Sequence, residues 1–156
     1  MSKIILLIVF LVAAFFVFQR MNAGNNAPEN IQIGSAFLIA NEAQEGVFST
    51  ASGLQYKVLE KGAGEVHPTA KSNVKVHYHG RLINGTVFDS SIDRGTPISF
   101  GLNQVISGWT EGVQLMVEGD KFRFYIPSRL AYGNRATGKI PAGSLLIFDV
   151  ELIAIN

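Results

Sequence analysis

The sequence predicts an α+β domain, in which a half-buried antiparallel β-sheet is joined by one short α-helix and preceded by an apolar amino-terminal helix. The strand evidence is an alternation of period two: residues 74–79 place Val, Val and Tyr on one face and Lys, His and His on the other. Residues 121–126 repeat the pattern, with Tyr125 on the polar side. Asn84-Gly85, between apolar residues, is a strong hairpin signal. Strands that alternate in this way indicate a sheet with one face in the core.

The chain has 156 residues, which is enough for one domain and an appendage. Residues 1–20 are expected to be a signal-anchor or signal peptide, residues 21–46 a tether and a short helix, and residues 47–156 the folded domain. The first part of the appendage, residues 21–30, is rich in Asn, Ala and Gly and contains Pro28, a composition typical of a flexible tether. Residues 35–46 then predict a short helix that ends at Gly46.

The amino-terminal segment consists of fifteen uninterrupted apolar residues, Ile4 to Phe18, between Lys3 and Arg20. A helix of this length spans roughly 22 Å, less than the roughly 30 Å of a bilayer core, which favours a signal peptide. The absence of a small-residue cleavage pattern and the snorkelling reach of Arg20 favour a retained anchor. Two readings stay open: a single-pass membrane anchor with the domain on the extracytoplasmic, periplasmic side, or secretion to the periplasm after cleavage.

Charge and composition argue against several classes of function. The net charge is +1 and no block of basic residues occurs, so nothing favours nucleic acid as a partner. The lack of cysteine excludes disulfides, thiol nucleophiles and cysteine zinc sites. His77 and His79 share a strand face without a third ligand, so a solvated strand face is favoured over a metal site. No metal or cofactor is expected, and no hydrolytic nucleophile with its base is found.

The single tryptophan, Trp109, opens a predicted helix over residues 109–116. Gly108 and Gly112 weaken that helix by about 1 kcal/mol each relative to alanine. Something must therefore approach the helix closely, and a ligand is one candidate. Further aromatic residues on strand-like stretches either line one apolar cup or are ordinary core: Tyr78, Phe88, Phe100, Tyr132 and Phe148.

These aromatic residues stand in five short motifs, which occur in the order Val76 to Gly80, Phe88 to Ser91, Val105 to Trp109, Ala131 to Gly133 and Leu146 to Leu152. In order and spacing the motifs resemble the FKBP-type peptidyl-prolyl cis-trans isomerases, from about Gly53 to Ile155. The lead-in at residues 51–58 is similar to the bacterial branch that includes the macrophage-infectivity-potentiator proteins. The resemblance implies a twisted antiparallel sheet wrapped around one short helix.

The implied activity is acceleration of X-Pro isomerisation during protein folding, with unfolded or partly folded proline-containing proteins as partners. The barrier of about 18–20 kcal/mol is the loss of amide resonance, so no nucleophile is needed. An apolar aromatic pocket favours the less polar twisted amide over the planar one. A non-catalytic, chaperone-like module that binds unfolded segments is the alternative function.

The resemblance also implies a set of site residues. Trp109 would lie under the proline ring, the Tyr132 hydroxyl and the Ile106 amide would hold the substrate backbone, and Ile140 would contact it from the flap at residues 133–143. The expected catalytic residues are Asp89, Trp109, Tyr132 and Phe148, and the expected substrate-binding residues are Tyr78, Phe88, Arg94, Val105, Ile106 and Ile140.

Several points stay open at this stage. The family's pattern joins Asp89 to Tyr78 and Arg94 by hydrogen bonds, but Asp89 could instead start a turn as an Asx residue. Macrolide inhibitors are implied, yet Ile98 stands where many eukaryotic members carry a further aromatic. Only about thirty residues separate the apolar segment from the domain, so the family's helical dimerisation module is expected to be largely missing and the chain monomeric. Asp149 and Glu151 alternate with apolar residues and are expected on the outer face.

Overall fold

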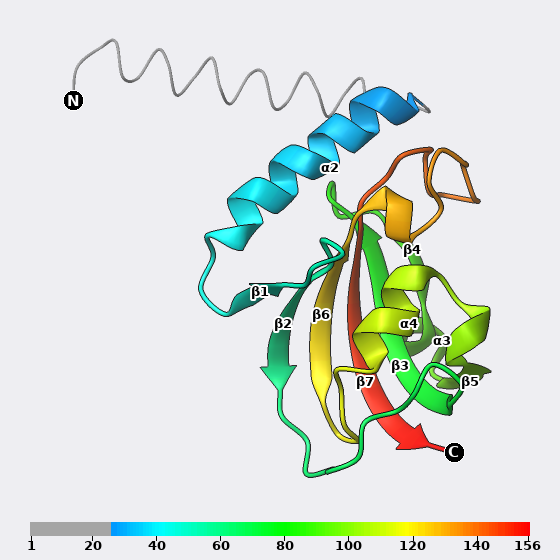
Figure 1. Cartoon of the computed structure of the whole chain (residues 1–156). Coiled ribbons are helices and arrows are strands. Elements are labelled where there is room, and N and C mark those ends of the chain that lie inside the picture. The colour runs from blue at the N-terminus through cyan, green and yellow to red at the C-terminus, as the bar shows by residue number, and fades with distance from the viewer. Residues whose placement is uncertain (1–25) are drawn as a thin grey trace.

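The computed structural model of the protein describes residues 26–156. The predicted apolar segment at residues 4–18 and the first residues of the predicted tether lie outside the described residues. The elements follow in the order α2 (Ala27–Glu42), β1 (Val47–Ser49), β2 (Gln55–Glu60), β3 (Asn73–Leu82), β4 (Val87–Ser90), α3 (Ser91–Arg94), β5 (Ile98–Gly101), η1 (Leu102–Gln104), α4 (Ser107–Val113), β6 (Lys121–Ile126), η2 (Ser128–Leu130) and β7 (Leu146–Ile155) (Figure 1).

The predicted antiparallel sheet is confirmed. It has seven strands in the order β1-β2-β6-β7-β3-β4, with β5 paired to β3, and every pair is antiparallel. The predicted hairpin joins β3 to β4, and Gly85 adopts a φ of +88° there, which a residue with a side chain rarely adopts. α4 lies across one face of the sheet, so the sheet wraps around this short helix (Figure 1).

The core lies between α4 and the inner face of the sheet. The alternating residues of β3 and β6 point into it as predicted, since Val74, Val76, Phe124 and Ile126 are fully buried. On the outer face, Asp149 accepts two hydrogen bonds from Arg123, at 2.7 and 2.9 Å, and Glu151 is exposed. The expected orientation of these two acids is therefore confirmed.

The helix at Trp109 is shorter than predicted, and its glycines have a different explanation. It ends at Val113, and the following residues continue as i→i+3 turns that still bury Met116. A Cβ added at Gly108 would lie 2.5 Å from Ile126, and one at Gly112 would lie 2.7 Å from Phe124. The close approach is made by β6 of the sheet, so the suggestion that a ligand requires these glycines is wrong.

Within the described part of the region predicted as a tether and short helix, residues 27–42 form one helix of 16 residues, α2. The Asn26 side chain accepts a hydrogen bond from the Glu29 backbone amide, and Pro28 lies in the first turn. Asparagine at the N-cap, proline in the first turn and an acid near the amino end are helix-start signals. Residues that suggested flexibility by composition therefore begin the helix.

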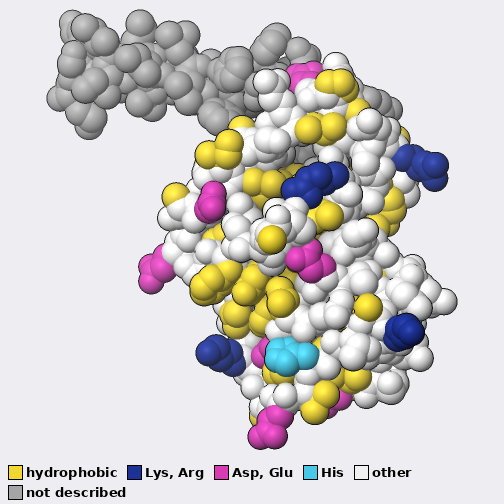
Figure 2. All heavy atoms as spheres, in the orientation of Figure 1, with side chains coloured by type: hydrophobic (Ala, Val, Ile, Leu, Met, Phe, Trp, Pro, Cys, Tyr) yellow, Lys and Arg dark blue, Asp and Glu magenta, His cyan; other side chains and the backbone are white. Residues whose placement is uncertain are grey.

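α2 covers part of the outer face of the sheet. Phe37 packs against Tyr125, with ring centroids 6.0 Å apart, and Leu145 and Ile147 are buried in the same cluster. Tyr125 thus points outward as predicted but is buried, because the helix covers it. No helix within residues 26–156 is long and apolar enough to span a bilayer. On the face drawn in Figure 2, the Lys and Arg side chains lie apart from one another and form no basic patch.

Candidate active site

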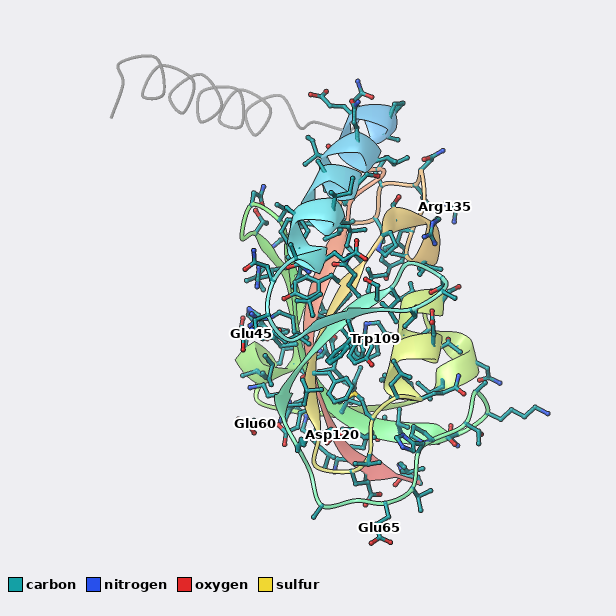
Figure 3. All side chains as sticks on the ribbon, turned by 60° about the vertical axis from the view of Figure 1, so that its left-hand side comes forward. Glu45, Glu60, Glu65, Trp109, Asp120 and Arg135 are labelled. Atoms are coloured by element: carbon teal, nitrogen blue, oxygen red, sulfur yellow. The ribbon has the colours of Figure 1, made fainter. Side chains whose placement is uncertain are left out.

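The candidate site begins with three buried aromatic rings between α4 and the sheet. Trp109 comes from α4, Tyr78 from β3 and Phe148 from β7, and each is 5 or 6% exposed. The Trp109 ring lies 5.2 Å from Phe148 and 5.4 Å from Tyr78 between centroids, with interplanar angles of 86° and 82°. Figure 3 shows Trp109 directed into the space between α4 and the strands. Edge-to-face packing of this kind holds the indole in a fixed orientation.

The indole N–H of Trp109 is buried and has no hydrogen-bond partner among the described residues. Leaving a buried donor unpaired costs about 1–3 kcal/mol. The contacts with the neighbouring rings therefore determine the position of the indole, and hydrogen bonding does not.

A half-buried apolar rim surrounds these rings. Phe88 packs edge-on against Phe148 at 5.3 Å, and Phe100 lies 5.4 Å from Trp109. Further half-buried side chains pack against the same core: Val105, Ile106, Leu130 and Ala131. A buried floor with a partly exposed apolar rim is suited to a small apolar group such as a proline ring. We call these residues the aromatic cluster: Tyr78, Phe88, Phe100, Trp109 and Phe148.

Gly80 is a member of this site that the sequence reasoning did not single out. It is an inward-facing residue of β3, and a Cβ there would lie 2.7 Å from ring atoms of both Phe88 and Phe148. A glycine at an inward position of a strand marks a close approach, and this signal was present in the alternation of β3.

Asp89 and two other polar side chains form a hydrogen-bonded group beside the rings. The Tyr78 hydroxyl donates to the Asp89 carboxylate, and Arg94 forms an ion pair with the same carboxylate. Arg94 also donates to the Tyr78 hydroxyl at 3.0 Å, and its guanidinium carbon lies 5.7 Å from the Tyr78 ring centroid. The three side chains come from β3, β4 and the last turn of α3, so the short β4–α3 connection brings them together.

This group changes the acid–base properties of its members. Desolvation, the largest single influence, opposes ionisation of Asp89, but the hydrogen bonds from Tyr78 and Arg94 outweigh it and hold the pKa of Asp89 below its ordinary value. Burial, followed by the hydrogen bond to Asp89, raises the pKa of Tyr78. Asp89 is therefore ionised and Tyr78 is neutral near pH 7, which leaves the tyrosine as a hydrogen-bond donor.

The turn after β4 is capped by Ser90. The Ser90 hydroxyl accepts from the Asp93 amide at 3.1 Å and begins α3. Ser91 is fully buried and accepts from the Tyr78 amide at 2.7 Å, which ties α3 to β3. The side-chain hydrogen bonds of Asp89 are directed to Tyr78 and Arg94.

The two strand histidines bond to these serines rather than to each other. His77 Nδ1 lies 2.9 Å from the Ser91 hydroxyl, and His79 Nδ1 lies 2.9 Å from that of Ser90. Within residues 26–156, no group of three or more His, Asp or Glu side chains is placed to hold a metal ion.

The long loop between β6 and β7 carries the last two expected site residues. Tyr132 is 39% exposed and lines a shallow hollow with Ala131, Asn134 and Arg135. Ile140, the expected apolar contact from this loop, is 6% exposed and packs into the main core. Reciprocal hydrogen bonds of 2.9 Å between the backbones of Thr137 and Ile140 close a tight turn that holds it there.

Comparison with known protein families gives a family match for most of the described residues. The family model for FKBP-type peptidyl-prolyl cis-trans isomerases matches residues 64–153. The chain therefore belongs to the FKBP-type peptidyl-prolyl cis-trans isomerase family. A second model, for the domain amino-terminal to such isomerases, matches residues 10–58. Part of the amino-terminal region typical of the family is thus present, where the sequence suggested that it was largely missing.

Individual relatives agree with this assignment. The FKBP-type isomerase FkpA of Aeromonas hydrophila is 57% identical over 88% of this chain and 51% of its own length. The outer membrane protein MIP of Legionella longbeachae is 45% identical over 83% of this chain and 56% of its own length. This chain spans about half the length of these curated relatives.

Solved structures show the same arrangement. The crystal structure of FkpA from Escherichia coli aligns with a TM-score of 0.80 and 36% identity, over 100% of this chain and 74% of that one. The isomerase from Pseudomonas syringae pv. tomato aligns with a TM-score of 0.76 and 37% identity, over 83% and 96%.

Proposed function

We propose that this chain catalyses cis–trans isomerisation of X-Pro bonds in unfolded or partly folded proteins, with the proline ring held in the aromatic cluster. The observation that carries the proposal is the buried floor of Tyr78, Trp109 and Phe148 beneath a half-buried apolar rim. Membership of the isomerase family supports the reaction class.

The mechanism that fits this geometry is preferential binding of the twisted amide. Isomerisation breaks no covalent bond, and the planar amide resists rotation by about 18–20 kcal/mol. The twisted amide is less polar, so an apolar surface of rings stabilises it relative to the planar substrate. Phe88, Val105 and Ile106 would enclose the proline, while the Ile106 amide and the Tyr132 hydroxyl would hold the flanking backbone. No metal or cofactor takes part in this mechanism.

Asp89 has an electrostatic role in this proposal. Its negative charge lies beside the rings and is paired with Arg94. The carboxylate also keeps the Tyr78 hydroxyl oriented through a hydrogen bond. A fixed carboxylate repels the planar carbonyl oxygen, which carries more negative charge than that of the twisted amide.

The location proposed is extracytoplasmic, with residues 4–18 retained as a membrane anchor; secretion after cleavage is the alternative. The fifteen-residue apolar segment and the relative named an outer membrane protein support membrane association. A monomer is proposed, and macrolides of the family's ligand type are expected to inhibit.

The test is exchange NMR of a Phe-Pro peptide with the full chain in mild detergent micelles. Trp109→Leu should lower kcat/KM at least about tenfold, equivalent to about 1.4 kcal/mol of transition-state stabilisation. Phe48→Leu alters an exposed aromatic residue on edge strand β1 and should leave the rate unchanged. Wild-type chain that is folded by circular dichroism but gives the uncatalysed rate would refute catalysis and favour a binding module.

A further inference from the structure

The chain between β6 and β7 has an unusual charge pattern. No Asp or Glu occurs between Asp120 and Asp149, whereas five basic residues do: Lys121, Arg123, Arg129, Arg135 and Lys139. The whole chain has almost equal numbers of acids and bases, 12 against 13. The excess of positive charge in this stretch is therefore local.

Strand β6 accounts for two of these charges. Arg123 is paired with Asp149 on the outer face. Lys121 lies opposite Glu151 of β7 and Glu60 of β2 in the strand register, so acids flank it on both sides.

The other three cations lie on the loop after β6. Within residues 26–156 the ion pairs are those of Arg94 and Arg123, so Arg129, Arg135 and Lys139 have none there. Their charges are available to an external anion.

Arg135 is the loop cation that lines a hollow. The hollow is shallow and is formed by Ala131, Tyr132, Asn134 and Arg135. Ala131 also packs against the apolar core that contains Trp109, so the hollow adjoins the site proposed for proline. Figure 3 shows Arg135 on this loop, at the end of the molecule where α2 begins.

Three side chains around this hollow carry N–H or O–H groups: the guanidinium of Arg135, the amide of Asn134 and the hydroxyl of Tyr132. A guanidinium forms a planar pair of hydrogen bonds with a carboxylate, and the amide and hydroxyl are further donors. An extended peptide with its proline in the aromatic cluster would pass the loop that carries them. A carboxylate on that peptide is the group that this combination recognises best.

We propose that Arg135 is a specificity-determining residue that binds the side-chain carboxylate of an Asp or Glu near the substrate proline. The inference rests on the proposed isomerase function and adds a substrate class to it, namely acidic proline-containing segments. Because an ion pair of this kind is made equally with the planar and the twisted amide, it lowers KM and leaves kcat unchanged.

The test compares peptides that share the same Phe-Pro core and carry Glu, Gln or Lys two or three residues before or after it. Exchange NMR with the full chain measures kcat/KM for each peptide. At low ionic strength, the best-placed Glu peptide should exceed its Gln counterpart about two- to fivefold, the upper part of the range for an exposed ion pair. The ratio should approach one in high salt, because salt screens exposed charges.

Three variants separate this effect from the general charge of the protein. Arg135→Glu should reverse the preference in favour of the Lys peptide, and Arg135→Lys should retain part of the preference for Glu. Lys71→Glu removes an exposed cation in the turn before β3, at the opposite end of the sheet, and should keep the wild-type ratio.

Equal rates for the Glu and Gln peptides at every position, or an unchanged preference in Arg135→Glu, would overturn the proposal. Turnover of the Gln peptide tests the isomerase function by itself. Failure of the specificity proposal can therefore be distinguished from failure of the activity.

Discussion

A single methyl group added at Gly80 should displace two rings of the aromatic cluster without removing either. Gly80 lies opposite Phe148 of β7 and Asp89 of β4 in the sheet register. A Cβ at this position would lie 2.7 Å from Cε1 of Phe148 and 2.7 Å from Cε2 and Cζ of Phe88. Carbon atoms in contact are ordinarily about 3.5–4.0 Å apart, so both rings must withdraw by roughly 0.8 Å or more.

The cost follows from this double overlap. Overpacking a core by a methyl group costs about 1–3 kcal/mol, and two rings that must move together place Gly80→Ala in the upper part of that range. For a domain of this size, about 2–3 kcal/mol corresponds to a fall in Tm of about 6–15 °C. Because the displaced rings belong to the proposed floor and rim for proline, kcat/KM should also fall about tenfold, or about 1.4 kcal/mol.

Thermal unfolding followed by circular dichroism measures the stability, and the emission of Trp109, the single tryptophan, reports on the cluster itself. The matched control is Gly85→Ala, where φ is +88° and an added Cβ meets no atom within 4 Å. Its left-handed backbone costs about 1–2 kcal/mol, but the rings stay in place, so emission and kcat/KM should remain at wild-type values. Gly80→Ala with wild-type Tm and activity would refute the described packing.

Four further outcomes are expected. Asp89→Asn should lower turnover several-fold with the fold intact, because Tyr78 and Arg94 donate to different oxygens of the carboxylate and Asn has an acceptor at only one of these positions; full activity would favour the turn-forming role. The pKa of Asp89 lies below its ordinary value of 3.8, so the stability that its charge contributes is complete above that pH and is lost as pH falls through the folded-state pKa. The Tm difference between wild type and Asp89→Asn should therefore shrink in acid, and a constant difference would contradict this. The Asn30 side-chain amide donates a hydrogen bond of 2.8 Å to the Ala142 carbonyl, so Asn30→Ala should lower the free energy of unfolding by about 1–3 kcal/mol. An unchanged midpoint of urea unfolding would contradict this. Residues 4–18 should hold the chain in the membrane fraction through high salt and carbonate, whereas an intact mass that lacks this segment would establish cleavage.

The sheet could be predicted from the sequence because burial on one face imposes a period of two, and β3 and β6 follow it closely. The end of α4 could not be predicted from the sequence. Met116 has helical spacing from Trp109 and Val113 and is fully buried, yet it lies in the turn that follows the helix. A continued helix and a turn at this point bury the same side chains, and they differ in their backbone hydrogen bonds.

The candidate site was predicted in part. Its aromatic members could be identified from the motifs, and their rings are in contact. The geometry of these rings depends on residues that are not proposed to contact the substrate. Gly80 gives the rings room, and the hydroxyl of Ser91 fixes α3 to β3. Such residues support a site through tertiary contacts, which a one-dimensional pattern does not contain.

The amino-terminal helix illustrates how a composition can mislead when position is ignored. Asn26 and Pro28 suggested a flexible segment, but Asn26 caps the first turn of α2 and Pro28 lies within that turn. A second signal was available on the sheet, because Tyr125 and Ile147 are apolar residues at outward positions and an apolar outer face requires a cover. α2 supplies that cover, and its Asn30 binds the loop before β7. The same loop carries the hollow beside the proposed proline site, so Asn30, the last residue of the predicted tether, holds the loop that contributes to this hollow.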